Sequence, residues 1–316
     1  MAENQPVIKV REEFTAAIAV KDLEKTVEFL TRYFGIWPWR RFDVDRKVTY
    51  KGKPAAYTGP RAIYESGPFS LMVDLSEGTG QQVDFVKRTG GGPNQLITHV
   101  EDVDAAVAKL EKAGIPVLMG ERGENGKWRW AFMDTMKASG GNIPCVEVGA
   151  VSKKVAAPAM AALADNQSVI KARGTFEIAI AVKDVGKTVE FLTHYFGIGP
   201  WRRWEVDRPV IYKGKQTRYT GLRANYKFGP HQIQVGQNEG EGQMIDFVKR
   251  TGGGLNQLIL MMDDVDMAVA KLEKAGIPVQ MGMKNESGKW VFAFMDTLKA
   301  SGGNFPCIEV GPVPRE

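Results

Sequence analysis

Near its beginning, the chain has a pattern of apolar residues that predicts one strand followed by one helix. Positions 14–20 form an apolar run of strand length. Asp22 is a residue type that caps helices, and apolar residues then recur at helical spacing as far as Phe34, just before Gly35. Three strand-like stretches come next, at 41–58, 61–66 and 69–76. The pattern therefore predicts a βαβββ unit.

The same order of elements starts again after a glycine-rich turn. Positions 95–101 predict a strand, and either Asp102 or Asp104 opens a helix that ends at Gly114. Further strands are expected near Val117, at 128–132 and at 145–148. Paired strands that follow a crossover helix indicate a mixed sheet with its helices packed outside.

An internal repeat doubles this arrangement. The segment FTAAIAVKDLEKTVEFLTRYFGI at Phe14 returns as FEIAIAVKDVGKTVEFLTHYFGI at Phe176, which is 162 positions later. The same offset relates FVKRTGGGPNQLI at Phe85 to FVKRTGGGLNQLI at Phe247, and no gap is needed between them. We therefore expect an α+β protein of four βαβββ units that arose by tandem duplication.

The repeat also predicts two domains and a linker. We expect the first domain at 10–150 and the second at 174–313. The positions between them, 151–173, are rich in Ala and Lys and lack the alternation of a strand. They predict a linker with one short helix around Ala156 to Ala164.

The composition excludes several classes of protein. Apolar residues make up 43% of the chain and charged residues 25%, and no apolar run approaches the roughly 18 residues that would span a bilayer. The N-terminal segment lacks the apolar core of a secretory signal, which favours a cytoplasmic protein. The net charge of +5 comes without a basic stripe, so we expect neither a nucleic-acid nor a membrane partner. Cys145 and Cys307 occupy equivalent places in the repeat and are expected to be reduced thiols.

Several phrases of the sequence carry a family resemblance. They are AIAVKDLEKTVEFL, FGIWPW, FVKRTGGGPNQL, VEDVDAAVAKLEKAGIPV and AFMDT, followed by a last strand that contains Glu. Together they make the chain similar to the vicinal oxygen chelate superfamily, which includes glyoxalases, bleomycin-resistance proteins, dioxygenases and methylmalonyl-CoA epimerase. The resemblance covers both repeats. It implies two tandem glyoxalase-like domains with curved mixed sheets and outer helices.

The resemblance further implies four metal-ligand positions in each domain, but the two histidines of the family pattern are absent from both. The matching residues are Thr15, Met72, Gln95 and Glu147 in the first domain, and Glu177, Gln234, Gln257 and Glu309 in the second. Without imidazole ligands we expect no transition metal and no other cofactor. The all-oxygen set of the second domain leaves a hard divalent cation, such as Mg²⁺ or Mn²⁺, as the alternative.

The two repeats differ most along one strand. Positions 69–76 read FSLMVDLS, whereas the equivalent positions 231–238 read HQIQVGQN. Gln232 and Gln234 share one face of this strand, and a buried amide needs hydrogen-bond partners. We therefore expect a polar pocket in the second domain. The alternative is a strand that faces solvent and is free to vary.

This expected pocket leads to a hypothesis of function. Glu177 and Glu309, if buried and facing each other, would have raised pKa values and could move a proton beside a carbonyl group. Gln234 and Gln257 would hold the carbonyl oxygen. We therefore predict an isomerase or lyase that acts on a small, largely apolar carbonyl or aromatic compound without a transition metal. Its main site would lie in the second domain.

Other residues are candidates for binding the substrate, and a second function stays open. The further candidates are Gln232, His231, Trp201 and Tyr212 in the second domain, and Thr15, Gln95 and Glu147 in the first. The second strand of each domain is basic, with Arg40 and Arg46 in the first, and either faces solvent or binds a carboxylate or phosphate. The alternative function is a non-catalytic binder of a small drug-like molecule, of the bleomycin-resistance type. The chain is expected to be a monomer or a homodimer.

Overall fold

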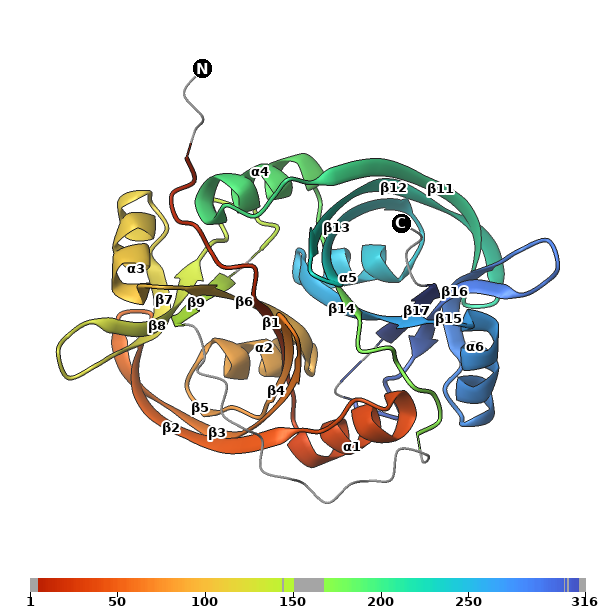
Figure 1. Cartoon of the computed structure of the whole chain (residues 1–316), viewed down its shortest axis with the longest axis horizontal. Coiled ribbons are helices and arrows are strands. Elements are labelled where there is room, and N and C mark those ends of the chain that lie inside the picture. The colour runs from red at the N-terminus through yellow and green to blue at the C-terminus, as the bar shows by residue number, and fades with distance from the viewer. Residues whose placement is uncertain (1–4, 144, 151–167, 304, 306, 313–316) are drawn as a thin grey trace.

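The computed structural model describes residues 5–143, 145–150, 168–303, 305 and 307–312. They form two barrels that lie side by side (Figure 1). The expected linker at 151–173 lies mostly outside the described residues, and the short helix expected around Ala156 to Ala164 lies wholly outside them. Within the described part of the chain, no helix is long and apolar enough to cross a membrane.

The first barrel is built from the first repeat. Its strands within the described residues are β1 (Phe14–Ala19), β2 (Arg40–Tyr50), β3 (Lys53–Ser66), β4 (Phe69–Asp74), β5 (Glu77–Gly78), β6 (Gly92–Val100), β7 (Val117–Arg122), β8 (Trp128–Asp134) and β9 (Cys145–Ala150). Its helices are α1 (Leu23–Phe34), α2 (Gln81–Thr89) and α3 (Val103–Lys112). The strands follow one another in the order β2-β7-β8-β9-β6-β1-β4-β3-β5, and a further pairing of β2 with β3 closes the sheet.

The second barrel repeats this plan. Its strands are β10 (Phe176–Ala181), β11 (Arg202–Tyr212), β12 (Lys215–Phe228), β13 (His231–Gly240), β14 (Gly254–Met262), β15 (Val279–Lys284), β16 (Trp290–Asp296) and β17 (Cys307–Pro312). Its helices are α4 (Val185–Phe196), α5 (Gln243–Thr251) and α6 (Val265–Lys274). The closed barrel has the strand order β10-β13-β12-β11-β15-β16-β17-β14.

Both sheets are mixed, as the sequence predicts. β1 runs parallel to β4 and antiparallel to β6, and β6 runs parallel to β9. β10, β13, β14 and β17 repeat the same relations in the second barrel. α1, α3, α4 and α6 lie outside the barrels (Figure 1). The predicted α+β fold of four βαβββ units, with curved mixed sheets and outer helices, is confirmed.

The outer helices begin at the residues whose side chains can cap them. Asp22 accepts a hydrogen bond from the Lys25 amide at 3.0 Å, which satisfies one of the unpaired amides at the start of α1. Gly35 ends this helix with a φ of 66°, a left-handed conformation that favours glycine. α3 begins after Asp102 rather than Asp104.

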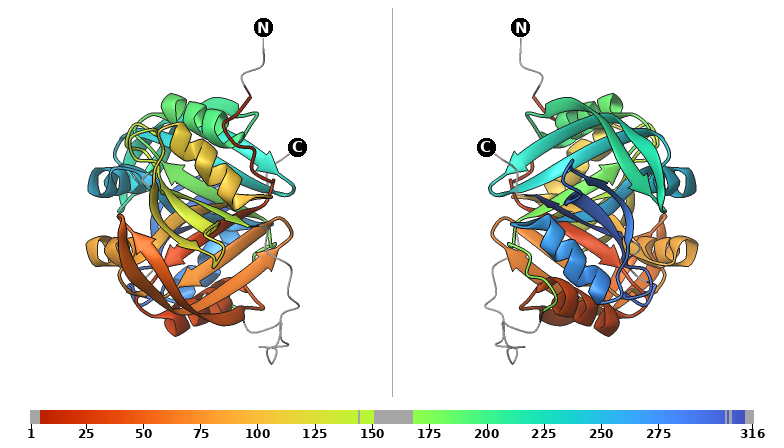
Figure 2. Two further views of the ribbon diagram at one scale, coloured as in Figure 1. Left: turned by 90° about the vertical axis from the view of Figure 1, so that its left-hand side faces the viewer. Right: turned by 90° about the vertical axis from the view of Figure 1, so that its right-hand side faces the viewer.

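α2 and α5 are helices that the apolar pattern does not predict. Each has nine residues and begins after a glycine, Gly80 or Gly242, which has no side chain to cap it. Gln82 and Phe85 of α2 are buried, and the helix contacts β1 and β6. Figure 2 shows α2 and α5 on the same side of the molecule. Their stability therefore depends on packing against the barrels, because the local sequence offers few helix signals.

The two barrels share one continuous core. β6 contacts β14, and aromatic side chains from both domains pack together beside them. Phe14 lies edge-on to Phe228 with ring centroids 4.7 Å apart, and the Phe69 and Phe176 centroids are 5.0 Å apart. The His231 ring packs against three of these phenylalanines. All five side chains are buried, so the domains stabilise each other through this cluster.

The chain segment that precedes each domain packs on the other domain. The amide of Val7 donates to the carbonyl of His194 in α4 at 2.8 Å. The amide of Val169 donates to the carbonyl of Arg32 in α1 at 2.9 Å. Figure 1 shows these two segments, beside α4 and beside α1, in matching places on the two domains. The relative position of the domains is therefore fixed by backbone hydrogen bonds as well as by the aromatic cluster.

His231, which the sequence suggests as a substrate contact, belongs to this interface instead. Its Nδ1 accepts from the Phe176 amide at 3.2 Å, and its Nε2 lies 2.9 Å from the Ser66 carbonyl oxygen. Nε2 must therefore donate, and the ring is neutral. Burial lowers the pKa of His231 below its ordinary value. Adding a proton to Nδ1 would break the hydrogen bond to Phe176.

Replacing His231 should change how stability depends on pH. In the unaltered protein the unfolded chain binds a proton at this histidine more readily than the folded one, so stability falls as the pH drops through about 6.5. His231→Phe, which copies Phe69 of the first repeat, should flatten this fall. It should also cost about 1–3 kcal/mol at neutral pH, because Ser66 and Phe176 lose their partner. Urea unfolding at several pH values measures both effects, and an unchanged pH slope would contradict the account.

Candidate functional site

The interior of the first barrel contains a cavity of about 450 Å³. Its wall takes side chains from every strand of that barrel except the short β5. The aromatic side chains that line it are Phe42, Tyr57, Trp130 and Phe132. The charged ones are Arg40, Arg46, Arg61, Glu121, Arg129 and Glu147. The cavity therefore combines an aromatic wall with an excess of arginine.

Glu121 on β7 is shared by two of these arginines. Its carboxylate accepts from Arg129 Nη1 and from Trp130 Nε1, both at 2.9 Å, and lies 3.2 Å from Arg46 Nη1. The guanidinium of Arg46 lies 6.0 Å from the centroid of the Trp130 ring. Because two cations share one anion, this side of the cavity carries a net positive charge. We call Arg46, Glu121, Arg129 and Trp130 the Glu121 group.

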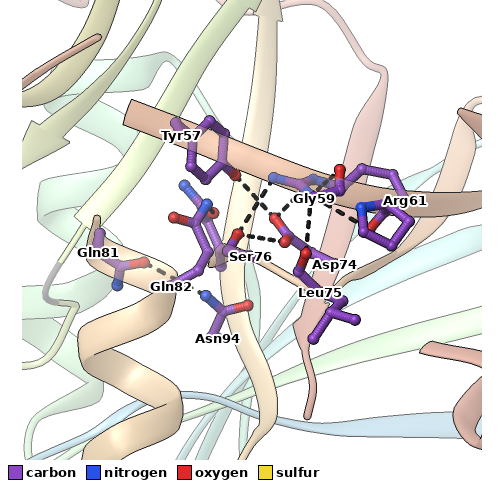
Figure 3. A network of polar contacts seen from close by, with 11 residues as sticks. Tyr57, Gly59, Arg61, Asp74, Leu75, Ser76, Gln81, Gln82 and Asn94 are labelled. Carbon is purple, nitrogen blue, oxygen red and sulfur yellow. Dashed lines mark hydrogen bonds and ion pairs between the residues drawn. The ribbon is translucent and has the colours of Figure 1, made fainter. Parts of the chain in front are cut away.

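Arg61 on β3 is buried and fully paired (Figure 3). Its side chain is only 2% exposed, and its Nε lies 3.1 Å from Asp74 Oδ2. Arg61 Nη2 donates to Ser76 Oγ at 3.2 Å, and the Tyr57 hydroxyl donates to Asp74 Oδ2 at 2.9 Å. Burial raises the pKa of Asp74, while the charge of Arg61 and the hydrogen bonds that Ser76 and Tyr57 donate to the carboxylate oppose the shift. This arginine and its carboxylate form a neutral pair.

Glu147 on β9 presents a carboxyl group to the cavity. Burial raises its pKa to about 8, and repulsion from Asp74 adds to the effect, while Arg46 and Arg61 oppose it. Among the described residues, this carboxyl group has no hydrogen-bond or ion-pair partner. Near neutral pH it therefore keeps its proton and can donate a hydrogen bond into the cavity.

Thr15 and His99 form a second polar contact on the cavity wall. Thr15 Oγ1 lies 3.3 Å from His99 Nε2, and His99 Nδ1 lies 3.2 Å from the Ala150 carbonyl oxygen. Burial lowers the pKa of His99, so its ring is neutral at physiological pH. Nδ1 donates to the carbonyl, and Nε2 accepts from the threonine hydroxyl.

The first domain does not offer the donors that a metal ion needs. Thr15, Met72 and Glu147, three of the four positions matched to the family pattern, line the cavity. Gln95 turns away, since its Oε1 accepts from Gln82 Nε2 at 3.2 Å. A hydroxyl, a thioether and one carboxyl group are a poor ligand set. Nowhere in the described part of the chain do three or more His, Cys, Asp or Glu side chains gather as a metal site would require.

The second barrel has a smaller cavity of about 150 Å³, lined in part by Gln234 and Glu309. Gln234 Nε2 donates to Glu177, and Gln257 Nε2 donates to Glu309 Oε2 at 2.9 Å. Burial raises the pKa of Glu177 to about 7. Burial, with repulsion from Glu177, raises the pKa of Glu309 to about 8. The structure thus brings the four matched residues of the second domain together.

These four side chains do not fit a hard divalent cation. Both amides turn their N–H groups toward the carboxyl groups, whereas a cation would need the amide oxygens. Arg223, only 2% exposed, lies close enough to lower the pKa of both Glu177 and Glu309. Its guanidinium already supplies positive charge at this place. The donor set therefore does not support the Mg²⁺ or Mn²⁺ alternative.

The other predicted substrate-binding residues of the second domain do not line this cavity. Trp201 donates to the backbone that follows α4, and Tyr212 donates to Asp246 of α5 at 2.6 Å. Gln232 accepts a hydrogen bond from a side chain of β12. His231 is held in the interface between the domains. Gln232 and Tyr212 share strand faces with the cavity-lining Gln234 and Arg208 but lie farther along their strands, where each has a partner of its own.

The Glu121 group is the main feature that the sequence-based prediction missed. A signal for it exists in the repeat, because Glu121 and Arg129 correspond at the offset of 162 to Met283 and Val291. Trp130 corresponds to Phe292. A charged pair in one copy and two apolar residues in the other indicate that the two interiors differ at β7 and β8 as well as at β4.

Comparisons with known proteins agree with this architecture. A family model described as the Glyoxalase/Bleomycin resistance protein/Dioxygenase superfamily matches residues 16–132 and 176–294. A triple mutant of 4-hydroxymandelate synthase from Streptomyces coelicolor matches with a TM-score of 0.54 and 14% sequence identity, over 98% of this chain and 94% of that chain. A xylose isomerase-like TIM barrel/4-hydroxyphenylpyruvate dioxygenase fusion protein matches with a TM-score of 0.46 and 12% identity, over 97% of this chain and 49% of its own. No curated protein matches the chain.

These comparisons correct the prediction of an isomerase or lyase, which is wrong. A solved structure that matches over almost the whole of both chains is a mutant of 4-hydroxymandelate synthase. At 14% identity this likeness shows the fold alone, so no reaction is transferred from it. The family description names glyoxalases and dioxygenases, which are enzymes, beside bleomycin resistance proteins. Because the family model matches most of both repeats, the chain belongs to the glyoxalase/bleomycin resistance protein/dioxygenase superfamily.

Proposed function

We propose that the protein binds a small organic anion with a flat apolar body in the cavity of the first domain. The observation that carries the proposal is the Glu121 group. Arg46 and Arg129 share the single Glu121 carboxylate beside the Trp130 ring. A carboxylate, sulfonate or phosphate that enters the cavity would supply the second anion, and arginine pairs with such groups through charge-assisted hydrogen bonds.

The remaining charged groups of the cavity leave this positive charge uncompensated. Arg61 is neutralised by Asp74, and Glu147 is uncharged near neutral pH because its pKa is raised to about 8. Arg40 Nη2 lies 3.6 Å from Glu65 Oε1. The buried Nε of Arg40 has no hydrogen-bond partner among the described residues. Arg40 and Glu147 therefore supply further donors to a bound anion.

The walls of the cavity favour a flat apolar body on the same ligand. Phe42, Trp130 and Phe132 line it, and the Arg40 guanidinium lies 5.3 Å from the Phe42 ring centroid. Aromatic walls with stacked guanidiniums suit an aromatic ring that carries negative charge. The volume of about 450 Å³ falls within the range of roughly 300–1,000 Å³ that is usual for small-molecule sites.

This proposal keeps the small aromatic ligand expected from the sequence and moves the main site to the first domain. The cavity of the second domain is smaller, at about 150 Å³. Met283 and Val291 stand there in place of Glu121 and Arg129, so Arg208, the counterpart of Arg46, lines that cavity without a second arginine on a shared carboxylate beside it. The domain bounds 10–150 and 174–313, the cytoplasmic location and the monomeric or homodimeric state stay predictions.

Arg129→Val, which copies Val291, should weaken the binding of 1-naphthalenesulfonate by at least about tenfold. The reason is the loss of one charge-assisted hydrogen bond to the anion. Titration calorimetry at low ionic strength measures the affinity. Arg122→Met is the matched control, because Arg122 is an exposed arginine that stacks on Trp128 outside the cavity. An equal loss in both variants, or no binding to the unaltered protein, would contradict the proposal.

Affinity for this sulfonate should fall as the pH rises through about 8, because Glu147 then loses its proton and places negative charge in the cavity. The charged groups around Glu147 are Asp74, which raises its pKa, and Arg46 and Arg61, which lower it. His99 is already neutral. Glu147→Gln should bind normally at neutral pH and show no decline above it. Calorimetric titrations across this pH range provide the check, and a decline that persists in the variant would assign it to another group.

A further inference from the structure

Arg223 on β12 is the counterpart of Arg61 in the repeat, and it lacks the carboxylate that pairs with Arg61. Gly236 stands at the position of Asp74. Arg223 is 2% exposed, and its Nη1 donates to two backbone carbonyls of β12 and β13 at 2.8 and 3.0 Å. Its Nη2 has no hydrogen-bond partner among the described residues. A buried guanidinium without a carboxylate partner is unfavourable, so a negatively charged group that binds beside Arg223 would be stabilised.

The surroundings of Arg223 leave room for such a group and for a ring attached to it. Arg223 lines the cavity of about 150 Å³. The space directly over Gly236 is filled, because Met244 Cε lies 2.8 Å and Arg223 Cζ 3.3 Å from the position that a Cβ would take, so a ligand reaches Arg223 from the cavity. A cavity of roughly this size can hold a benzene ring. The aromatic side chains of its wall are Trp204, Tyr219, Phe292 and Phe294.

The two glutamates near Arg223 do not replace the missing aspartate. Gln234 donates to Glu177 and Gln257 donates to Glu309, and neither glutamate forms an ion pair with Arg223 among the described residues. Burial raises the pKa of Glu177 to about 7 and that of Glu309 to about 8. In mildly acidic solution both carry a proton, so they do not repel an entering carboxylate.

We propose that the cavity of the second domain is a second ligand site, in which Arg223 binds the carboxylate of a small aromatic acid. From the cavity, this carboxylate supplies to Arg223 the negative charge that Asp74 supplies to Arg61 in the first domain. The ring lies against the aromatic wall of the cavity. This site rests on Arg223 and Gly236 alone and is independent of the anion site proposed for the first domain.

Crystals of the full chain soaked in 4-bromobenzoate at about pH 6 test the proposal, because the anomalous signal of bromine locates the ring. We expect bromine in the cavity of the second domain and the carboxylate on Arg223. Titration calorimetry with the same compound measures the affinity in solution. Arg223→Met should lower that affinity by at least about tenfold, since the charge-assisted hydrogen bonds are lost.

A second variant keeps the test decisive if Arg223→Met folds poorly. Gly236→Asp combined with Met244→Gln copies Asp74 and Gln82, so the protein then supplies its own carboxylate. Met244 is changed because its Cε lies only 2.8 Å from the Cβ position at 236. This variant should fold normally and lose binding to the same degree. Arg218→Met removes an exposed arginine of the same strand and should bind as the unaltered protein does.

Two results would overturn the proposal. The first is the absence of a bromine signal from the cavity of the second domain, even if bromine is found in the cavity of the first domain. The other is an affinity that the Gly236→Asp/Met244→Gln variant retains. Neither result bears on the Glu121 group, whose own variants test the first domain separately.

Discussion

A buried arginine that stacks on a tyrosine ring lies inside each barrel, and the charge around it determines what the interior can hold. The guanidinium of Arg61 is 4.7 Å from the Tyr57 ring centroid, and that of Arg223 is 5.0 Å from the Tyr219 centroid. A guanidinium cannot lose its charge under ordinary conditions, so each barrel must balance it. The first barrel does so with Asp74, whereas the second has no carboxylate at that position.

Because only one of the two buried arginines has a carboxylate partner, the same fold encloses two different interiors. In the first barrel the central charge is neutralised, and the net positive charge arises nearer the aromatic wall, from Arg46 and Arg129 around Glu121. In the second barrel the charge stays at the centre, and apolar side chains replace the ion pair at the wall. The helices and their caps are the same in both, and the strand pairings correspond, except that β13 is continuous where β4 and β5 are separate. The domains therefore differ in their interiors while keeping one fold.

The sequence predicts the framework of the fold well, because its signals are local. Asp22 and Gly35 mark the ends of a helix by their own chemistry, and the repeat shows that the arrangement occurs twice. α2 and α5 escape prediction because their helical state depends on contacts with the barrel. His231 escapes because two of its partners, Ser66 and Phe69, come from the other domain. When a residue is buried by a segment far away in the chain, the local pattern of apolar and polar residues does not indicate it.

The candidate site could be predicted only in part, for the same physical reason. Alignment to the family pattern correctly groups Glu177, Gln234, Gln257 and Glu309, since equivalent strands meet in equivalent barrels. It cannot give the size of a cavity or the charge of its wall, which depend on side chains from strands far apart in the chain. Glu121 gains its role only when β2, β7 and β8 are assembled. Comparing the two repeats position by position is the sequence evidence that comes nearest to this information.

Arg61 has a protein carboxylate as its partner, whereas Arg223 has none among the described residues. Comparing the free energies of unfolding of Arg61→Met and Arg223→Met tests this difference most directly. We expect a loss of about 3–5 kcal/mol for Arg61→Met, because Asp74 is left buried without its cationic partner. For Arg223→Met we expect a change of no more than about 1 kcal/mol, or a gain in stability, because a buried charge without an ion-pair partner is removed. Equal losses in the two variants would contradict this difference.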